Sequence, residues 1–300
     1  MAKLRSKHSS GKGSNSGGMI TKVGIFSGLL AALYFVFNLF SGDATSLMGD
    51  AEDEELYQPR KEFYLPTSNG QVIHQKYYTL SYSEEHEQAE WVAYKLTRDE
   101  LKMEWVKRRD EFKSDPRVRT GSAELDDYYR SGYDRGHLVP AADRMFSDEA
   151  MLETFYLSNI SPQSRNFNQG IWRELEELTR NWAKKYKELY VVAGPVLSVP
   201  PKGTIGDNEV SVPQAYFKVL LDISEPEVKS IAFVIPNQVS YDPLFEFAVS
   251  IDEVETLTGI DFFAELLDES LEKELESSFN IDLWEFSKKK YELRVNKWNK

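Results

Sequence analysis

Ser131-Gly132-Tyr133-Asp134-Arg135-Gly136-His137-Leu138 is the most informative stretch of this 300-residue chain. It holds one of only four histidines, framed by an aspartate, an arginine and a glycine. Histidine is the side chain best suited to move a proton near neutral pH, and arginine offers a planar, permanently charged fork for phosphate oxygens. A glycine between them lets a substrate backbone approach closely. The competing interpretation is a structural His and Arg at a strand end, because short motifs carry a false-positive risk.

Around this stretch, strand and helix signals mix without a regular alternation, which predicts an α+β fold with a mostly antiparallel sheet flanked by helices. Five β-rich or apolar runs predict strands, at residues 77–82, 91–96, 189–193, 215–221 and 231–235. Apolar residues at helical spacing predict a helix over 168–187, and a second helical zone covers 251–276.

A second group of motifs follows the histidine stretch in order. The motifs are Ser158-Asn159-Ile160, Pro162-Gln163, Asn168-Gln169 and Trp172 with Leu175-Glu176. Together with Asp134-Arg135-Gly136-His137, this series resembles the DNA/RNA non-specific endonuclease family, and similar flanking stretches extend the resemblance over most of residues 75–265. The resemblance implies a ββα-metal active site on the α+β fold.

The resemblance also implies roles for individual residues. His137 matches the general base that deprotonates the attacking water, Arg135 matches a phosphate-binding arginine, and Asn159 matches a site residue near the histidine. A further phosphate-binding arginine is expected upstream, where the candidates are Arg108 and Arg109, and the spacing to the following phenylalanine favours Arg109. An exposed basic face is the other interpretation of that arginine pair.

The metal site implied by the resemblance consists of Asn168 and Glu176. Asn168 matches the single direct protein ligand of a hydrated Mg²⁺, and Glu176 matches the carboxylate that holds the metal-bound waters. Mg²⁺ prefers oxygen ligands and keeps several waters, so one amide oxygen can suffice, and Mn²⁺ should substitute. In an unbroken helix the two residues would differ by about 80° around the axis and roughly 12 Å along it. Taken singly, Asn168 would be a helix cap and Glu176 a solvated carboxylate.

The activity implied by the resemblance is metal-dependent hydrolysis of DNA and RNA phosphodiester bonds to 5′-phosphate products, without sequence or sugar specificity. Contacts to phosphate and sugar rather than to base edges explain such indifference. Two alternatives are a tethered nucleic-acid-binding protein without catalysis and a phosphodiesterase acting on a smaller substrate such as a nucleotide.

The overall composition argues against a protein that only holds nucleic acid. Lys plus Arg number 36 and Asp plus Glu number 49, which gives a formal net charge of −13. The excess acid lies in residues 43–90 and 222–300, whereas residues 91–221 are neutral overall. There are no cysteines, which excludes disulfides, Cys-ligated zinc, iron–sulfur clusters and thiol catalysis.

An N-terminal apolar run predicts a membrane segment. Residues 23–40 carry no charge and would span roughly 27 Å as a helix, just enough for a bilayer core. All five bases of residues 1–22 precede this run and the first charges after it are acidic, so the N-terminus is expected to stay in the cytoplasm. A cleaved signal peptide is the alternative, although secretory apolar regions usually have only about 7–15 residues.

The predicted organisation has five segments: a cytoplasmic basic segment (1–22), a transmembrane anchor (23–42), an acidic tether (43–60), a nuclease domain (61–286) and a basic C-terminal tail (287–300). The predicted partners are DNA, RNA and, through residues 23–42, a membrane. The resemblance allows a homodimer, and the sequence carries no signal for an inhibitor protein. The expected location of the catalytic domain is the bacterial periplasm or cell exterior, with the mitochondrial inner membrane facing the intermembrane space as the alternative.

Overall fold

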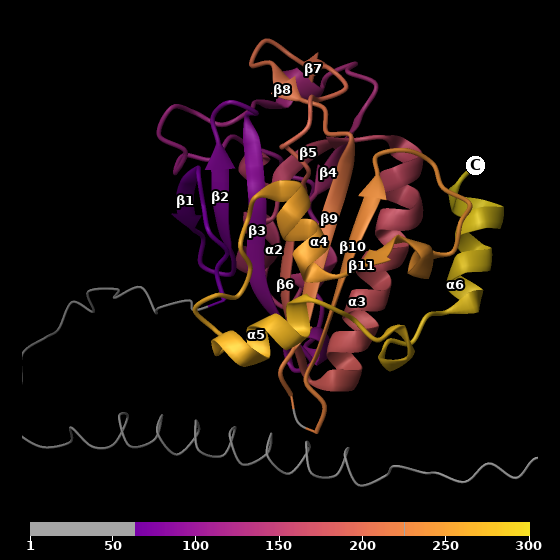
Figure 1. Cartoon of the computed structure of the whole chain (residues 1–300). Helices are drawn as coiled ribbons and strands as arrows, with labels where there is room; N and C mark the ends of the chain where they lie inside the picture. The colour runs from indigo at the N-terminus through magenta and orange to yellow at the C-terminus, as the bar shows by residue number, and fades with distance from the viewer. Residues whose placement is uncertain (1–63, 225) are drawn as a thin grey trace, which may run out of the picture. The chain divides into compact units, whose positions relative to one another are not determined.

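Seven antiparallel strands form the central sheet of the region that the computed structural model describes, residues 64–224 and 226–300 (Figure 1). In spatial order they are β1 (Gln71–His74), β2 (Thr79–Ser83), β3 (Gln88–Thr97), β6 (Glu188–Pro195), β9 (Ala215–Asp222), β10 (Lys229–Pro236) and β11 (Ala248–Val249). Every neighbouring pair in this order runs antiparallel. The expectation of a mostly antiparallel sheet is therefore confirmed, and all five predicted runs contribute strands to it.

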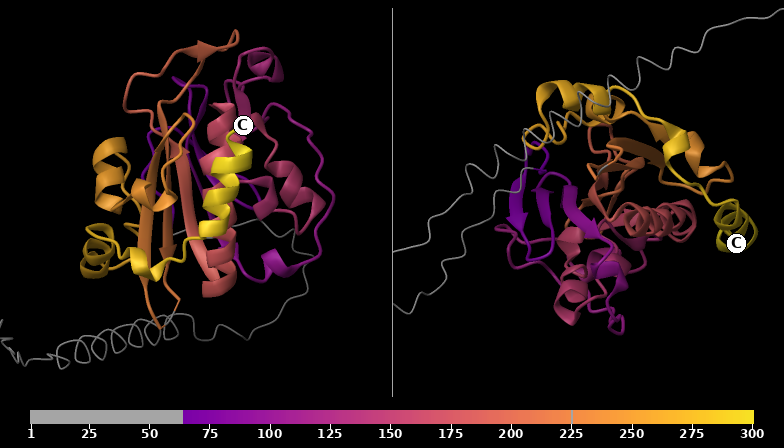
Figure 2. Two further views of the ribbon diagram at one scale, coloured as in Figure 1. Left: turned by 90° about the vertical axis from the view of Figure 1, so that its right-hand side faces the viewer. Right: turned by 90° about the horizontal axis from the view of Figure 1, so that it is seen from below.

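Helices cover both faces of this sheet (Figure 2). They are α2 (Asp148–Glu153), α3 (Arg173–Tyr186), α4 (Ile251–Thr258), α5 (Glu269–Glu276) and α6 (Lys288–Leu293). The long helix α3 packs against β3 and β6 on one face, whereas α4 and α5 pack against β10 on the other. The apolar stripe of α3 that the sequence predicts is the buried side of the helix, with Leu175, Leu178 and Trp182 in the core.

Strand β9 shows how the sheet separates these two layers. Successive side chains of a strand point to opposite faces. Phe217 packs against Phe262 near α4, with ring centroids 5.7 Å apart. Its neighbour Lys218 lies on the α3 face, with Nζ 4.8 Å from the centre of the Trp172 ring. Phe217 and Lys218, neighbours on β9, thus face opposite helical layers.

Two smaller strand pairs complete the sheet structure of the described residues. β4 (Asp134–His137) pairs with β5 (Ile160–Gln163), and β7 (Thr204–Ile205) pairs with β8 (Val210–Ser211), both antiparallel. Because β5 leads into the segment that contains α3, the chain forms a strand–strand–helix unit carrying the histidine stretch.

The helix predicted over 168–187 is not continuous. Phe167–Trp172 forms a π-helical turn, and within it Gly170 leaves helical geometry at φ −102° and ψ −109°. A Cβ at Gly170 would lie only 2.7 Å from Oδ1 of Asn299, so the close approach of the C-terminus favours glycine there. The offset between Asn168 and Glu176 expected for an unbroken helix therefore does not apply.

The helical zone predicted over 251–276 is two helices rather than one. α4 begins with a capping box in which Ser250 and Glu253 each accept a hydrogen bond from the backbone N–H of the other. It ends at Gly259, whose φ of +73° is a left-handed conformation that glycine adopts without steric cost. The chain then turns before α5 starts at its N-cap, Asp268.

The last residues of the chain are not a tail. Helix α6 continues into a π-helical turn, Arg294–Trp298, which packs against the turn before α3. Arg294 is fully buried and its Nε donates to Oε2 of Glu174 at 2.6 Å. The sequence interpretation of 287–300 as a basic tail is corrected by this buried ion pair, because the segment is part of the folded domain.

The other predicted segments at the N-terminus, 1–22, 23–42 and 43–60, lie outside the described residues. Among residues 64–224 and 226–300, no helix combines the length and the apolar character needed to cross a bilayer.

Candidate active site

The strand–strand–helix unit places the histidine stretch beside α3. In the β4–β5 pair, His137 is opposite Ile160, and Gly136 is opposite Ser161. A Cβ on Gly136 would lie 2.1 Å from the side-chain Cδ of Gln163, so any other residue here would require the buried Gln163 side chain to move. The short pair thus fixes the histidine at the edge of the larger of two adjoining cavities.

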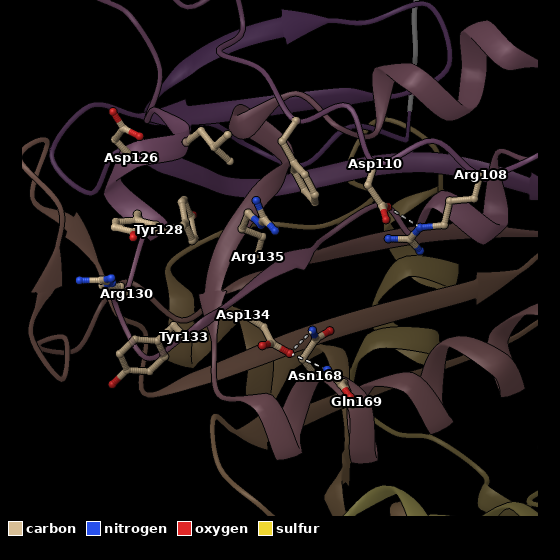
Figure 3. A pocket seen from close by; sticks show the side chains of 13 residues that line it. Arg108, Asp110, Asp126, Tyr128, Arg130, Tyr133, Asp134, Arg135, Asn168 and Gln169 are labelled. Carbon is tan, nitrogen blue, oxygen red and sulfur yellow. Dashed lines mark hydrogen bonds and ion pairs between the residues drawn. The ribbon is translucent and has the colours of Figure 1, made fainter.

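These cavities have volumes of about 480 and 660 Å³ and share four lining residues, Arg108, Arg135, Asn168 and Gln169. The larger one is also lined by His137 and Glu176. The smaller one, shown in Figure 3, is also lined by Asp134 and by the side chains of Tyr128, Tyr129 and Tyr133. The structure therefore brings four of the residues singled out in the sequence, Arg135, His137, Asn168 and Glu176, to one continuous depression.

His137 is held between aromatic rings. Its ring centroid lies 4.9 Å from that of Phe155, edge to face, and 5.7 Å from that of Phe112. Its Nε2 atom is buried and has no hydrogen-bond partner. The pKa of His137 is lowered to about 3, chiefly by burial and then by the positive charge of Arg108 and Arg135, against the opposing charge of Asp110. The imidazole is neutral at pH 7 and therefore able to accept a proton.

Two guanidinium groups adjoin the histidine. Arg135 is exposed and stacks on Phe112, with Cζ 4.4 Å from the ring centre. Arg108 forms an ion pair with Asp110 at 2.7 Å and lies over the Phe155 ring at 5.3 Å. Both arginines line both cavities, so an anion entering the depression would meet two positive charges beside a neutral base.

Arg109, which the spacing to Phe112 favoured, does not line either cavity. Its side chain forms ion pairs with Asp148 at 3.1 Å and with Glu111 at 3.6 Å. The structure thus places Arg108, the other candidate, at the site. Sequence spacing could not distinguish the two because adjacent residues of a loop can point in different directions.

Asn159 is placed near the histidine but not in the cavities. It is fully buried, and Oδ1 accepts from the backbone N–H of Val139 at 2.9 Å. Its Nδ2 donates to the carbonyl oxygens of Val139 at 3.1 Å and Thr154 at 2.9 Å. All of its amide atoms are occupied in this way, so Asn159 fixes the end of β4 and is not a residue that contacts substrate.

Asn168 lines both cavities and is oriented by Asp134. Its Nδ2 donates to Oδ2 of Asp134 at 3.0 Å, and Gln169 donates to the same oxygen at 3.1 Å (Figure 3). Because Asp134 engages the amide nitrogen, the amide oxygen of Asn168 remains an acceptor. Asp134 therefore orients the side-chain amide of Asn168.

Glu176 lines the larger cavity together with His137 and Asn168. Burial raises the pKa of Glu176 to about 7, and the positive charges of Lys218 and Arg180 oppose the rise. Among the described residues, none donates a hydrogen bond to its carboxylate or forms an ion pair with it at contact distance. A desolvated carboxylate and a free amide oxygen facing one cavity form an oxygen-donor set suited to a hard divalent cation.

Buried charged residues lie beneath Asn168 and Glu176, and the sequence motifs did not predict them. Lys218 is fully buried, its Nζ has no hydrogen-bond partner, and burial lowers its pKa against the opposing charges of Glu176 and Asp143. Arg180 donates to Asp143 at 2.8 Å, and Tyr94 donates to the same aspartate at 2.8 Å. One signal could have revealed this layer: Lys218 is a lysine within an otherwise apolar strand run.

Comparisons with known proteins agree with this geometry. The model of the family described as "DNA/RNA non-specific endonuclease" matches residues 57–269. The chain is 34% identical over 258 residues to "Nuclease EXOG, mitochondrial" of Danio rerio, covering 79% of this chain and 75% of that protein. It is 36% identical over 222 residues to "Nuclease C1" of Cunninghamella echinulata var. echinulata, covering 68% of this chain and 87% of that protein.

A solved structure is similar as well. Its title is "Crystal structure of the EndoG/EndoGI complex: Mechanism of EndoG inhibition", and it matches with a TM-score of 0.62 at 33% identity, covering 66% of this chain and 87% of the other. The chain belongs to the DNA/RNA non-specific endonuclease family. It is therefore a hydrolase and a nuclease with non-specific activity on nucleic acids.

Proposed function

We propose that the protein is a metal-dependent endonuclease that hydrolyses phosphodiester bonds of DNA and RNA to 5′-phosphate products, without sequence or sugar specificity. The observation that carries this proposal is the neutral His137 imidazole, which faces the same cavity as Asn168 and Glu176 beside two guanidinium groups. The match to the DNA/RNA non-specific endonuclease family supports the assignment of these residues to a nuclease active site.

The donor set fits Mg²⁺, and Mn²⁺ should substitute. Asn168 would hold the ion through its amide oxygen, and Glu176 would hold the ion's water ligands. Glu176 fits this role because its carboxylate is desolvated and lacks a donor within the described residues. When bound, the ion would supply positive charge to the phosphate and to the leaving oxygen.

The protein's own residues account for the rest of the reaction. The His137 imidazole accepts a proton from the attacking water, because burial and two nearby arginines keep the ring neutral. Arg135 and Arg108 bind phosphate oxygens, and Asp134 keeps the Asn168 amide in one orientation. The positive groups of the site recognise phosphate, which every nucleic acid presents, so discrimination between DNA and RNA is expected to be weak.

Nuclease assays on the full chain in detergent test this proposal, with long DNA, RNA and a small chromogenic diester as substrates. His137→Ala should lower kcat by about 10²–10⁴-fold, since a general base contributes a factor of this size. His86→Ala is the matched control, because His86 contacts Ser211 through Nδ1 and lines neither main cavity. Full activity of His137→Ala would remove the histidine from the mechanism, and preferred turnover of the small diester would assign a different substrate.

The same assays separate the two upstream arginines. Arg108→Ala should weaken activity more than Arg109→Ala, because only Arg108 lines the cavities. Equal losses for both variants would indicate a diffuse electrostatic contribution of the loop rather than a specific phosphate contact.

We further propose that residues 23–42 anchor the catalytic domain to a membrane, with the domain on the side opposite the cytoplasm or matrix. Two of the relatives, EXOG and endonuclease G, are named as mitochondrial, which supports the mitochondrial alternative. Extraction of membranes with alkaline carbonate tests the anchor, since a spanning helix stays in the pellet. Release of the full chain into the supernatant would exclude it. The homodimer remains a prediction of the family resemblance that light scattering of the detergent-solubilised chain can check.

A further inference from the structure

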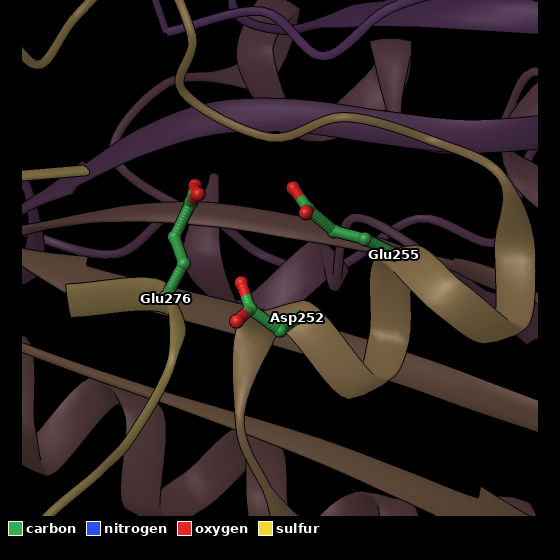
Figure 4. A group of neighbouring side chains, drawn as sticks. All are labelled: Asp252, Glu255 and Glu276. Atoms are coloured by element: carbon green, nitrogen blue, oxygen red, sulfur yellow. The ribbon is translucent and has the colours of Figure 1, made fainter. Parts of the chain in front are cut away.

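Three carboxylates converge on the sheet face opposite α3. Asp252 and Glu255 belong to α4, and Glu276 is the last residue of α5 (Figure 4). One oxygen from each side chain can be chosen so that all lie within 4.8 Å of one another. This group, called here the α4–α5 carboxylate cluster, has no part in the site described above, because the central sheet separates the two.

Glu276 provides a second observation, independent of the mere proximity of acids. Only 5% of this residue is exposed, and its Oε1 atom is buried with no hydrogen-bond partner. Its carboxylate lies beside that of Glu255 (Figure 4), and one of its oxygens lies within 4.8 Å of an oxygen of Glu255 and of Asp252. A buried carboxylate oxygen without a partner is costly, so natural proteins supply such an atom with a donor, a counter-ion or a metal.

The electrostatic surroundings of Glu276 supply no counter-ion. The pKa of Glu276 is raised to about 9, chiefly by burial and then by the negative charge of the neighbouring acids, which in order of effect are Glu255, Glu272, Asp261 and Asp252. Among the described residues, no lysine or arginine forms an ion pair with any member of the α4–α5 carboxylate cluster. The basic residue of α5, Lys273, is exposed.

The side chain of Glu255 is already fixed in position. Its Oε1 accepts a hydrogen bond from the backbone N–H of Phe262 at 2.9 Å, which leaves Oε2 available. This hydrogen bond ties α4 to the loop between the two helices. An ion bound between Glu255 and Glu276 would therefore connect α4, this loop and the end of α5.

We propose that the α4–α5 carboxylate cluster is a binding site for Ca²⁺ that stabilises the packing of α4 and α5. The ligands would be oxygens of Asp252, Glu255 and Glu276, with water completing the shell on the exposed side of Asp252. Ca²⁺ accepts 6–8 oxygen ligands in irregular geometry, whereas Mg²⁺ requires near-octahedral geometry and loses its waters reluctantly. No histidine or cysteine belongs to the cluster, which disfavours zinc and copper.

The proposal does not depend on the nuclease mechanism. Its ligands come from the layer on the other side of the sheet, and its role is to offset repulsion among carboxylates rather than to activate water. Calcium binding should consequently be independent of the asparagine that faces the catalytic cavity, and the two sites can be tested separately.

Calorimetric titration and thermal unfolding of the full chain, in detergent and stripped of metal with a chelator, test the proposal. Ca²⁺ should bind at one site per chain with Asn168→Ala in the background, which removes the proposed catalytic ligand. At about 100-fold excess over Kd, Ca²⁺ should raise the Tm by roughly 5–10 °C. Mg²⁺ at the same concentration should give a clearly smaller shift.

Matched variants identify the ligands. Glu276→Gln and Asp252→Asn should each weaken Ca²⁺ binding by at least about tenfold, since a charged ligand is lost from a site whose affinity depends on ligand charge. Asp252 is exposed, so its variant should fold normally even if Glu276→Gln is disturbed. Glu274→Gln is the control, because Glu274 is an exposed glutamate of the same helix outside the cluster. Absence of a Ca²⁺-dependent Tm shift, or an unchanged shift in both ligand variants, would overturn the proposal.

Discussion

Glu176 and Glu276 are two desolvated glutamates on opposite faces of one sheet. The charged groups with the largest effect on their pKa values are positive for Glu176 and negative for Glu276. Burial raises the pKa of Glu176 to about 7, where Lys218 and Arg180 oppose the rise. Burial raises the pKa of Glu276 to about 9, where the acids around it reinforce the rise. The α3 face thus contains its own counter-charges, whereas among the described residues no cation forms an ion pair with the α4–α5 carboxylate cluster.

The difference shows that burial alone does not define the role of a carboxylate. On the α3 face, resident cations lower the cost of keeping Glu176 ionised near neutral pH, which suits a group that must hold the waters of a catalytic metal. On the α4–α5 face, only a proton or an added cation can relieve the repulsion. Glu174 is another buried glutamate on the α3 face, and it also has a resident counter-charge, the equally buried Arg294.

The largest expected effect comes from removing a resident cation on the α3 face. Arg294→Met leaves Glu174 buried and unpaired, and it also removes the hydrogen bond from Nη2 to the carbonyl of Asp242 at 2.5 Å. Breaking one partner of a buried ion pair costs about 3–5 kcal/mol. Urea unfolding should show this loss in the free energy of unfolding.

The control for this experiment is Lys288→Met. Lys288 forms an exposed pair with Glu292 at 3.9 Å, and exposed pairs contribute about 0–1 kcal/mol. A loss for Arg294→Met as small as that of Lys288→Met would mean that the C-terminal segment contributes little to the fold, and would restore the interpretation of 287–300 as a tail.

The next effect concerns catalysis. Glu176→Gln keeps the shape of the side chain but removes the charge that would hold metal-bound water. Loss of such a supporting group lowers metal affinity or activity by about 10–100-fold. Titration of the nuclease rate with Mg²⁺ should show a lower maximum, or a midpoint at higher Mg²⁺ concentration. Glu274→Gln on α5 should match the unmodified protein in this assay, and a loss of equal size there would contradict the assignment of Glu176.

Much of the fold follows from local sequence patterns. The continuous apolar runs at 189–193, 215–221 and 231–235 lie within β6, β9 and β10, because strands in the middle of a covered sheet are apolar on both faces. The break at Gly170 could not be read from these patterns. The side chain of Asn299, near the end of the chain, lies where a Cβ at this position would be, and helical periodicity carries no information about such a contact.

Part of the active site also follows from local sequence patterns. Motif order predicts that His137, Arg135, Asn168 and Glu176 come together, because β4, β5 and α3 are all contained in residues 134–186. A motif does not say in which direction a loop side chain points or whether an amide is already fully bonded. Arg109 and Asn159 were therefore assigned to the site although the first pairs with Asp148 and the second is enclosed by backbone.

The smallest expected effect is the pH dependence of stability caused by Glu276 in metal-free protein. Its pKa in the folded state, about 9, lies above the usual value of 4.5, so the folded state binds the proton more tightly than the unfolded state. Protonated Glu276 stabilises the fold fully below about pH 4.5, and this contribution is lost as the pH rises through about 9. Glu276→Gln carries no titrating group, so its free energy of unfolding should exceed that of the unmodified chain at pH 9 and differ little from it at pH 5. Saturating Ca²⁺ should remove or reverse this advantage, because the bound cation takes the place of the proton.

A gain in the free energy of unfolding of Glu276→Gln that is the same at both pH values would contradict this prediction. The charge of Glu276 would then not be the cause, and the contrast with Glu176 would rest on packing alone.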